Sequence, residues 1–413
     1  MENEINDNHE ANLQKANPQE ENIQSAVELE IAKTYVFRKK IISTVLPVVL
    51  GVMALIGVVV CYVSFDAHRD EKYLQLEQTA SMYANDIKNM FYGYYRVGNH
   101  YYSIIQNFKK VDVNDRRKYY ENLTKKFLEN NPTVHSFWVD FDKNTFDGLD
   151  AKYRNVGKFN ETGRFCKLYY RDYRGKIISK PTFQTEEIMC PDAEFVSSPK
   201  KLKKPTVLDP YSFIYDHENR KETEKLITSI CFPIFENRYD VENSDIIGVT
   251  GIDILLETLI NKVENQNPYG INNIAVISSA YNVLTHYDTF KFGTHYSNTS
   301  IFNTLNWDTI HSQLQEYKTF NLTMLDKNDD TKKIIYFVPI ELNTTGSSLT
   351  LEIVFNYDEI MSDAWAFVFD IMLYFIVALF LVAVAIFLFS TFLYNSVFNR
   401  VAALRQLIGN FIN

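Results

Sequence analysis

Hydrophobic residues are distributed very unevenly along this chain, and two long apolar runs dominate the pattern. The first run covers residues 41–65 and the second covers residues 371–394, and neither contains Asp, Glu, Lys or Arg. A helix needs about 20 apolar residues to cross a bilayer, so each run is long enough to span one. A cleaved signal peptide is the alternative for the first run, but its apolar core would be about 7–15 residues long and would start closer to Met1. We therefore expect two transmembrane helices.

Charged residues beside the two runs predict how the chain is oriented. Lys and Arg lie on the outer flanks of both runs, at residues 38–40 and at Arg400 and Arg405, whereas acidic residues dominate the inner flanks. Positive charge favours the cytoplasmic side of a membrane. This pattern predicts a multi-pass protein of the bacterial inner or plasma membrane, with both termini in the cytoplasm and the central segment outside it.

The segments on either side of the first run differ in character. Residues 1–40 are rich in Glu, Asn and Gln, and we expect a disordered cytoplasmic tail because so little apolar surface is available for burial. Residues 66–110 predict a long stalk helix, because apolar residues recur there at alternating spacings of four and three: Tyr83, Ile87, Met90, Tyr94, Val97, Tyr101 and Ile104. This apolar face can pack on the same chain's own sheet, on a second copy of the chain in a homodimer, or on both.

Beyond the stalk, short β-rich segments alternate with polar loops and predict an α+β fold. We expect strands at residues 133–141, 176–178, 227–234, 246–254, 274–278, 332–339 and 348–355, and a helix at 304–317. Their grouping predicts two stacked PAS-like modules behind the stalk helix. The membrane-distal module would cover residues 111–260 and the membrane-proximal module residues 261–362.

Composition excludes several functional classes. The net charge of −9 argues against a general nucleic-acid-binding surface. No catalytic or phosphate-binding motif is present and the eight histidines are scattered, so we expect neither an enzyme nor a cofactor. Asp147-Gly148-x-Asp150 lacks the rest of a calcium-binding loop, which favours a turn held by Asp side chains over a metal site. At most one disulfide can form among Cys166, Cys190 and Cys231, and the first two are closest in sequence.

Several short motifs, taken in order, resemble the double Cache sensor domains of bacterial methyl-accepting chemotaxis receptors. They are Phe137-Trp138, the run 144–150, Thr162-Gly163-Arg164-Phe165, Tyr169-Tyr170-Arg171, Asp209-Pro210-Tyr211, Thr228-Ser229, Phe232-Pro233-Ile234 and the run 248–254. The match extends over about residues 66–357 and is most specific over 131–260. The resemblance implies two PAS-like modules, with a ligand bound in the membrane-distal one.

Candidate ligand-binding residues lie in the distal module. Trp138, Tyr169, Tyr170 and Tyr211 are candidate aromatic walls, and Asp253 is a carboxylate on an otherwise apolar segment, where burial without a partner would be costly. Asp253 can therefore bind a cationic amine, or it can be a structural carboxylate paired with an Arg or a backbone amide. In amino-acid-binding relatives the matching Asp holds the ligand amine, and an Arg two residues before the aromatic pair holds the ligand carboxylate. Lys167 occupies that Arg position here, followed by Tyr169, Tyr170 and Arg171. Lys lacks the bidentate fork of Arg, and this departure argues against an α-amino acid. The ligand classes that stay open are an amine, an amino acid or a purine-like molecule.

Residues 395–413 place apolar side chains at helical spacing after the second run, and this segment resembles the start of a HAMP signal-relay helix. We therefore expect a homodimeric transmembrane chemoreceptor, truncated before an output region that would engage a chemotaxis adaptor and kinase. The sensor half of a histidine kinase or diguanylate cyclase is one alternative. An extracytoplasmic binding or adhesion protein without signalling output is another.

Overall fold

The computed structural model describes residues 18–181, 193–216, 224–259, 271–286, 289–303, 305–327, 330–342 and 345–412. These residues form two compact units. One unit comprises the chain up to Glu71 together with the chain from Met361 onwards, and the other comprises Lys72–Ile360. The second unit is α+β, with a long N-terminal helix and two antiparallel sheets, which confirms the α+β class and the long helix predicted from the sequence.

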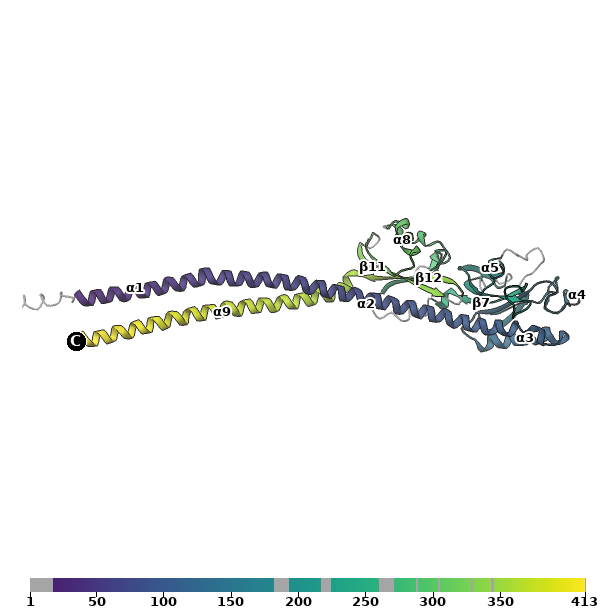
Figure 1. The fold of residues 1–413 in the computed structure, drawn as a ribbon, viewed down its shortest axis with the longest axis horizontal. Coiled ribbons are helices and arrows are strands. Elements are labelled where there is room, and N and C mark those ends of the chain that lie inside the picture. Colours follow the sequence, from purple (N-terminus) through teal and green to yellow (C-terminus); the bar gives the residue numbers. More distant parts are fainter. Residues whose placement is uncertain are drawn as a thin grey trace, which may run out of the picture. The chain divides into compact units, whose positions relative to one another are not determined.

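The first unit is built from long helices. Helix α1 (Pro18–Lys40) continues through a π-helical turn (Ile41–Val45) into α2 (Leu46–Ile105), and α9 covers Tyr357–Ile412. Both helical paths are long and apolar enough to cross a membrane, judged by length and composition. The two helices lie side by side (Figure 1): the rings of Phe65 and Trp365 are 4.5 Å apart, and a Cβ on Gly57 would lie 3.0 Å from Phe375.

Helix α1 occupies part of the predicted disordered tail. For residues 18–40 the structure is helical, so the expectation of disorder does not hold there, and residues 1–17 lie outside the described part of the chain. The segment contains many strong helix formers, including Glu, Gln, Ala, Leu and Lys, and a proline at its first position. Low hydrophobicity alone predicts disorder. The segment is helical because it directly extends a long apolar helix, so it needs no separate helix nucleation.

The distal part of the second unit contains a seven-stranded antiparallel sheet in the order β3-β2-β1-β7-β6-β4, with β5 also paired to β6. In the view of Figure 1, helices α2 and α3 lie on one side of β7 and α5 on the other. The elements are α3 (Val113–Asn130), β1 (Ser136–Phe141), α4 (Asp150–Tyr153), β2 (Cys166–Arg171), β3 (Ile177–Pro181), α5 (Glu194–Leu202), β4 (Thr206–Val207), β5 (Tyr211–Ile214), β6 (Glu224–Phe235) and β7 (Ile246–Leu255).

The proximal part contains a five-stranded antiparallel sheet in the order β10-β11-β12-β8-β9. Its strands are β8 (Ile271–Ser278), β9 (Val283–Thr285), β10 (Phe320–Asp326), β11 (Thr331–Leu342) and β12 (Ser347–Asn356). Helix α8 (Trp307–Gln315) buries Ile310 and Leu314 in the core of this sheet. The seven strands and the helix expected from the sequence are all confirmed. The elements that were not predicted from the sequence are α3, α4, α5, β2, β4, β5, β9 and β10.

The apolar face of the stalk segment of α2 packs on the chain's own sheets. Tyr83, Ile87, Tyr94 and Tyr101 are all buried, and the rings of Tyr101 and Phe137 are 4.8 Å apart. Contact with β6 is so close that a Cβ on Gly98 would lie 2.7 Å from the ring of Phe232. Most of the predicted apolar repeat is therefore used within one chain, while Leu74, Met82 and Tyr92 on the same helix are exposed.

Glu352 gives the proximal module a predicted pH dependence. It lies on β12 and is 5% exposed, and this burial raises its pKa from 4.5 to about 7. The folded module therefore holds this proton more tightly than the unfolded chain does, so stability falls as pH rises from about 4.5 through 7, by an amount on the order of 3 kcal/mol. We expect Glu352→Gln to raise the melting temperature at pH 8 and to change it little at pH 4.5. Glu341→Gln, an exposed change on β11, is the control, and an equal shift at both pH values would contradict this assignment.

Candidate ligand-binding site

The Asp253 carboxylate lies on β7, between β1 and β6, on the face of the seven-stranded sheet opposite the one covered by α3. It is 2% exposed and accepts four hydrogen bonds. Oδ1 accepts from Trp138 Nε1 at 2.9 Å and from Ser229 Oγ at 2.7 Å. Oδ2 accepts from Tyr215 Oη at 2.8 Å and from Ser136 Oγ. Burial raises the pKa of Asp253, and the four hydrogen bonds oppose that rise.

These donors come together because of strand register. Ser136 on β1 and Ser229 on β6 are the cross-strand neighbours of Asp253 on β7, so all three side chains point to the same face. All four donors are neutral, and no ion pair among the described residues includes Asp253. A structural carboxylate was expected to pair with an Arg or a backbone amide. Among the described residues, Asp253 instead accepts from two serines, a tyrosine and a tryptophan.

Gly251 lets the Trp138 indole lie across β7. A Cβ at position 251 would lie 2.4 Å from Cζ2 of Trp138 and 2.9 Å from the carbonyl oxygen of Ile230. No side chain larger than hydrogen fits while the indole keeps this position. The glycine thus allows Trp138 Nε1 to reach Asp253 two residues along the strand.

Gly251→Ala is expected to displace Trp138 and break its hydrogen bond to Asp253. Such overpacking costs about 1–3 kcal/mol in a well-packed core. The test is denaturant unfolding of the full chain together with the emission of Trp138, which should shift towards that of a more exposed indole. Gly93→Ala is the matched control because nothing lies within 4 Å of a Cβ there. Unchanged stability and emission in Gly251→Ala would contradict the close packing.

Aromatic side chains enclose the carboxylate. Trp138, Leu168, Phe195, Tyr211 and Phe213 line a cavity with Asp253. The cavity has a volume of about 10 Å³, and this is about the space that one water molecule needs. Tyr211 does not bond Asp253 directly; its hydroxyl lies 2.7 Å from Ser229 Oγ. The structure therefore shows the site closed around its carboxylate.

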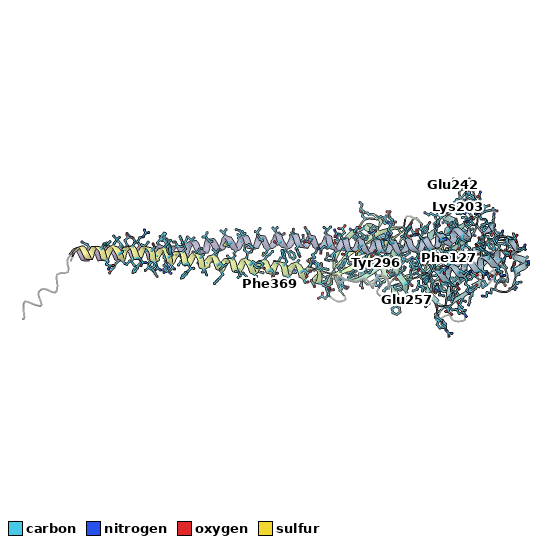
Figure 2. All side chains as sticks on the ribbon, turned by 90° about the horizontal axis from the view of Figure 1, so that it is seen from below. Phe127, Lys203, Glu242, Glu257, Tyr296 and Phe369 are labelled. Carbon is cyan, nitrogen blue, oxygen red and sulfur yellow. The ribbon has the colours of Figure 1, made fainter. Side chains whose placement is uncertain are left out.

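Two lysines, one in α5 and one directly after it, link this helix to neighbouring segments; α5 also carries Phe195. Lys200 Nζ contacts both carboxylate oxygens of Asp142 at 2.7 and 2.9 Å. Lys203 Nζ donates to the carbonyl oxygen of Glu242 at 3.1 Å, and Figure 2 labels both residues. The Lys200 contact is partly buried and the Lys203 contact is exposed, so both hold α5 less firmly than core packing would.

Three of the predicted site residues lie outside this group. Lys167 is buried on the opposite face of β2, where its Nζ is 3.0 Å from Glu121 of α3 and 3.8 Å from the centre of the Phe159 ring. Tyr169 has the same parity on β2 as Lys167 and lies on that helix-covered face. Arg171 donates to the carbonyl oxygens of Leu128 and Asn131 at the end of α3. The structure thus brings together Trp138, Tyr211 and Asp253, with Tyr170 in the same apolar cluster, but not Lys167, Tyr169 or Arg171.

Sequence reasoning missed Ser136, Ser229, Tyr215, Phe195 and Phe213. Strand alternation carried a signal for Ser136, because it lies two residues before Trp138 and so points to the same face. Ser229 lies on another strand, and only the register of β6 with β7 relates it to Asp253. Phe195 lies on α5, Phe213 lies on β5 and Tyr215 directly follows β5. Neither element was predicted from the sequence.

The Asp147 and Asp150 carboxylates form ion pairs with one arginine. Arg117 of α3 contacts Asp147 at 2.6 Å and Asp150 at 2.9 Å, and donates to the carbonyl oxygen of Gly163 at 2.7 Å. Asp147 also accepts from the amide of Leu149, which closes the turn. Gly163 has a φ of +67°, and a Cβ there would lie 2.0 Å from the carbonyl oxygen of Asp150. Among the described residues no group of acidic, His and Cys side chains is arranged to hold a metal.

Of the cysteines, Cys166 and Cys231 are both buried and free, and Cys190 lies outside the described residues. Burial raises the pKa of both thiols well above the ordinary value. Neither is therefore set up as a reactive thiolate.

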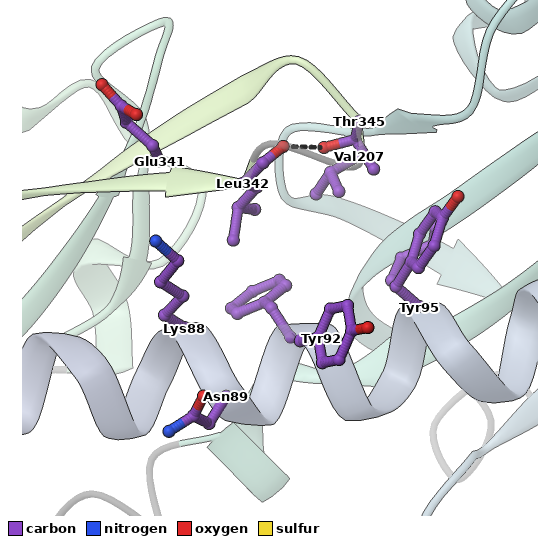
Figure 3. Close-up of a pocket in the computed structure, with 10 residues that line it drawn as sticks. Lys88, Asn89, Tyr92, Tyr95, Val207, Glu341, Leu342 and Thr345 are labelled. Atoms are coloured by element: carbon purple, nitrogen blue, oxygen red, sulfur yellow. Dashed lines mark hydrogen bonds between the residues drawn. The ribbon is translucent and has the colours of Figure 1, made fainter.

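A larger cavity, of about 270 Å³, lies where α2 meets both sheets. Figure 3 shows Lys88, Tyr92 and Tyr95 of α2 beside Leu342, the last residue of β11, and Thr345, which precedes β12. Its chemistry is mainly apolar, and it contains no convergent set of polar groups like that around Asp253. We therefore place the candidate ligand site at Asp253 rather than here.

The comparison with solved structures identifies the fold. The extracellular domain of the histidine kinase mmHK1S-Z2 matches with a TM-score of 0.55 and 19% identity, over 70% of this chain and 99% of the other. Methyl-accepting chemotaxis protein X matches with a TM-score of 0.53 and 17% identity, over 69% and 98%. The periplasmic sensory domain of the Campylobacter jejuni chemoreceptor Tlp1 matches with a TM-score of 0.52 and 13% identity, over 68% and 95%.

The fold is that of a double Cache sensor domain. This confirms the resemblance inferred from the sequence motifs, at the level of fold. The similar structures are sensor domains and not catalytic domains. No family model matches the sequence, and no curated protein matches it.

Proposed function

We propose that this chain is the sensing part of a transmembrane receptor that binds a small extracytoplasmic ligand in its membrane-distal module. The observation that carries the proposal is Asp253, a buried carboxylate surrounded by aromatic walls and by neutral donors only. Such a carboxylate attracts a cation, and aromatic faces add cation–π stabilisation. The ligand class that fits best is an amine or another small cation-bearing molecule, with amino acids and purine-like molecules included.

Binding requires the closed site to open. A cavity of about 10 Å³ has no room for an organic ligand, and four donors already fill the lone pairs of Asp253. The Tyr215 hydroxyl would yield its place to the ligand's ammonium group. The outer wall, formed by α5 and the four-residue strand β5, is the part that would move. Strand β5 pairs only with β6, and α5, a nine-residue helix, has only Val196 and Pro199 buried.

The signal would pass from this module towards the membrane along α2 and α9. Residues 41–65 and 371–394 would cross the bilayer, and the exposed positions of the stalk would contact a second copy in a homodimer. A displacement of about one or two ångströms is enough when packed helices have discrete alternatives. Residues 395–413 would begin a HAMP-like relay to a cytoplasmic region that engages a chemotaxis adaptor and kinase. A histidine kinase sensor is the second candidate, because similar structures come from both kinds of receptor.

A thermal-shift screen of the full chain in detergent tests the proposal. The panel contains amines, amino acids, purines and organic acids. A ligand at 100 times its Kd should stabilise the folded state by about 2.7 kcal/mol. We expect a cation-bearing compound to raise the melting temperature; a well-folded protein that responds to no compound would instead support an adhesion role.

A further inference from the structure

A second cavity lies at one end of the distal sheet, beside the candidate site. It has a volume of about 190 Å³ and forms where the start of β6 and the ends of β2 and β7 meet the residue before β1. Strand pairing brings these parts together: the amide of His135 donates to the carbonyl oxygen of Asp253, and the amide of Arg171 donates to that of His135. Tyr215 forms a wall here while its hydroxyl reaches Asp253.

One side of this cavity is cationic. His135, Arg171 and Lys225 all line it, and no ion pair among the described residues includes Arg171 or Lys225. Two nitrogen atoms, Nε2 of His135 and Nε of Arg171, are buried without a hydrogen-bond partner. Burial, together with the positive charges of Lys225 and Arg171, lowers the pKa of His135 to about 4. The electrostatic field at the His135 ring is therefore positive.

One carboxylate, that of Asp172, also lines the cavity. Its Oδ1 accepts from the amides of Arg174 and Lys176 at 2.9 and 2.8 Å, which holds it in a turn. It forms no ion pair with Arg171 or Lys225 among the described residues. Nη2 of Arg171 already donates to the carbonyl oxygens of Leu128 and Asn131. Its Nε, Nε2 of His135 and the Lys225 ammonium are thus left without an acceptor among the described residues.

The remaining lining is aromatic or aliphatic. Tyr170, Tyr173, Tyr215 and Leu255 supply it. The rings of Tyr215 and His135 meet edge to face with centres 4.7 Å apart. A free phosphate ion would leave these apolar surfaces without contacts. An anionic head attached to an apolar or aromatic body would use both sides of the cavity.

We propose that this cavity binds an organic carboxylate with an apolar or aromatic tail. The carboxylate accepts from Arg171, Lys225 and His135, and the tail packs between the tyrosine rings and Leu255. This site lies on the other side of Tyr215 from the Asp253 cavity, and it does not depend on amine binding to Asp253.

The test is calorimetric titration of the full chain in detergent with benzoate, acetate and inorganic phosphate at constant ionic strength. Benzoate should bind more tightly than acetate because only benzoate has a body for the aromatic walls. Lys225→Met should weaken benzoate binding about tenfold or more, because methionine has a side chain of similar length but no charged donor. Lys125→Met, the same change at an exposed position of α3, should leave the affinity unchanged.

Two results would overturn the proposal. The first is benzoate affinity in Lys225→Met equal to that of the wild type, with both proteins showing the same melting temperature without ligand. The second is a preference for phosphate over benzoate, which would show that the anion is recognised without its organic body. If Lys225→Met lowers the melting temperature itself, His135→Gln provides the same comparison, and undiminished benzoate binding there would equally contradict the site.

Discussion

The Arg117→Met variant is expected to lose about 3–5 kcal/mol of unfolding free energy, because the change leaves two buried carboxylates without their cation. The side chain of Arg117 is 3% exposed, and those of Asp147 and Asp150 are 0% and 5% exposed. The guanidinium also lies 4.1 Å from the ring centre of Tyr153. Denaturant unfolding of the full chain measures the loss.

Two further variants make this expectation specific. Lys118→Met changes the charge of the adjacent, exposed position of α3 and should leave stability nearly unchanged. Combining Arg117→Met with Asp147→Asn and Asp150→Asn removes the unpaired charges, so it should recover part of the loss. A loss below about 1 kcal/mol in Arg117→Met would show that the pair is effectively solvated.

The second large effect concerns ligand binding. For a cationic ligand identified in the thermal-shift screen, Asp253→Asn should weaken binding about 100-fold, because the amide is isosteric but carries no charge to pair with an ammonium group. The new amide nitrogen would also face one or two hydroxyl donors instead of accepting from them. Titration of the full chain with the ligand gives the ratio of affinities.

Asp112→Asn is the control for the charge change. Asp112 begins α3, where its Oδ1 accepts from the amide of Asn114 at 2.9 Å, and Asn caps helices as well as Asp does. Its affinity for the ligand should equal that of the wild type. If Asp253→Asn also binds normally, Asp253 has a structural role and the amine-binding assignment is wrong.

Much of the fold could be predicted because hydrophobic periodicity is a local property of the sequence. The segment 246–254 is rich in β-branched residues, and it forms β7 with bounds only one residue different. Strand β2 was missed because Lys167 interrupts its apolar pattern. In the structure, Glu121 and the Phe159 ring neutralise and cover that lysine, and both partners come from segments distant in the sequence.

The candidate site could be predicted only in part, for a similar reason. Asp253 and Trp138 were recognisable because a carboxylate and an indole occur in strongly apolar strands. The hydrogen bonds between them depend on the register of β1 with β7 and on Gly251, and neither could be inferred without the sheet. The directions of Lys167 and Tyr169 follow from strand parity, which a motif match does not supply.

The most direct test of the central claim is hydrogen exchange of the full chain with and without a ligand found in the screen. The account predicts slower exchange in β7, β5 and α5, where the ligand would contact Asp253 and the moving outer wall. It also predicts a smaller change in β8 to β12. Protection confined to β8–β12, or to the α2 residues around Lys88 and Tyr92, with no change near Asp253, would contradict ligand sensing in the membrane-distal module.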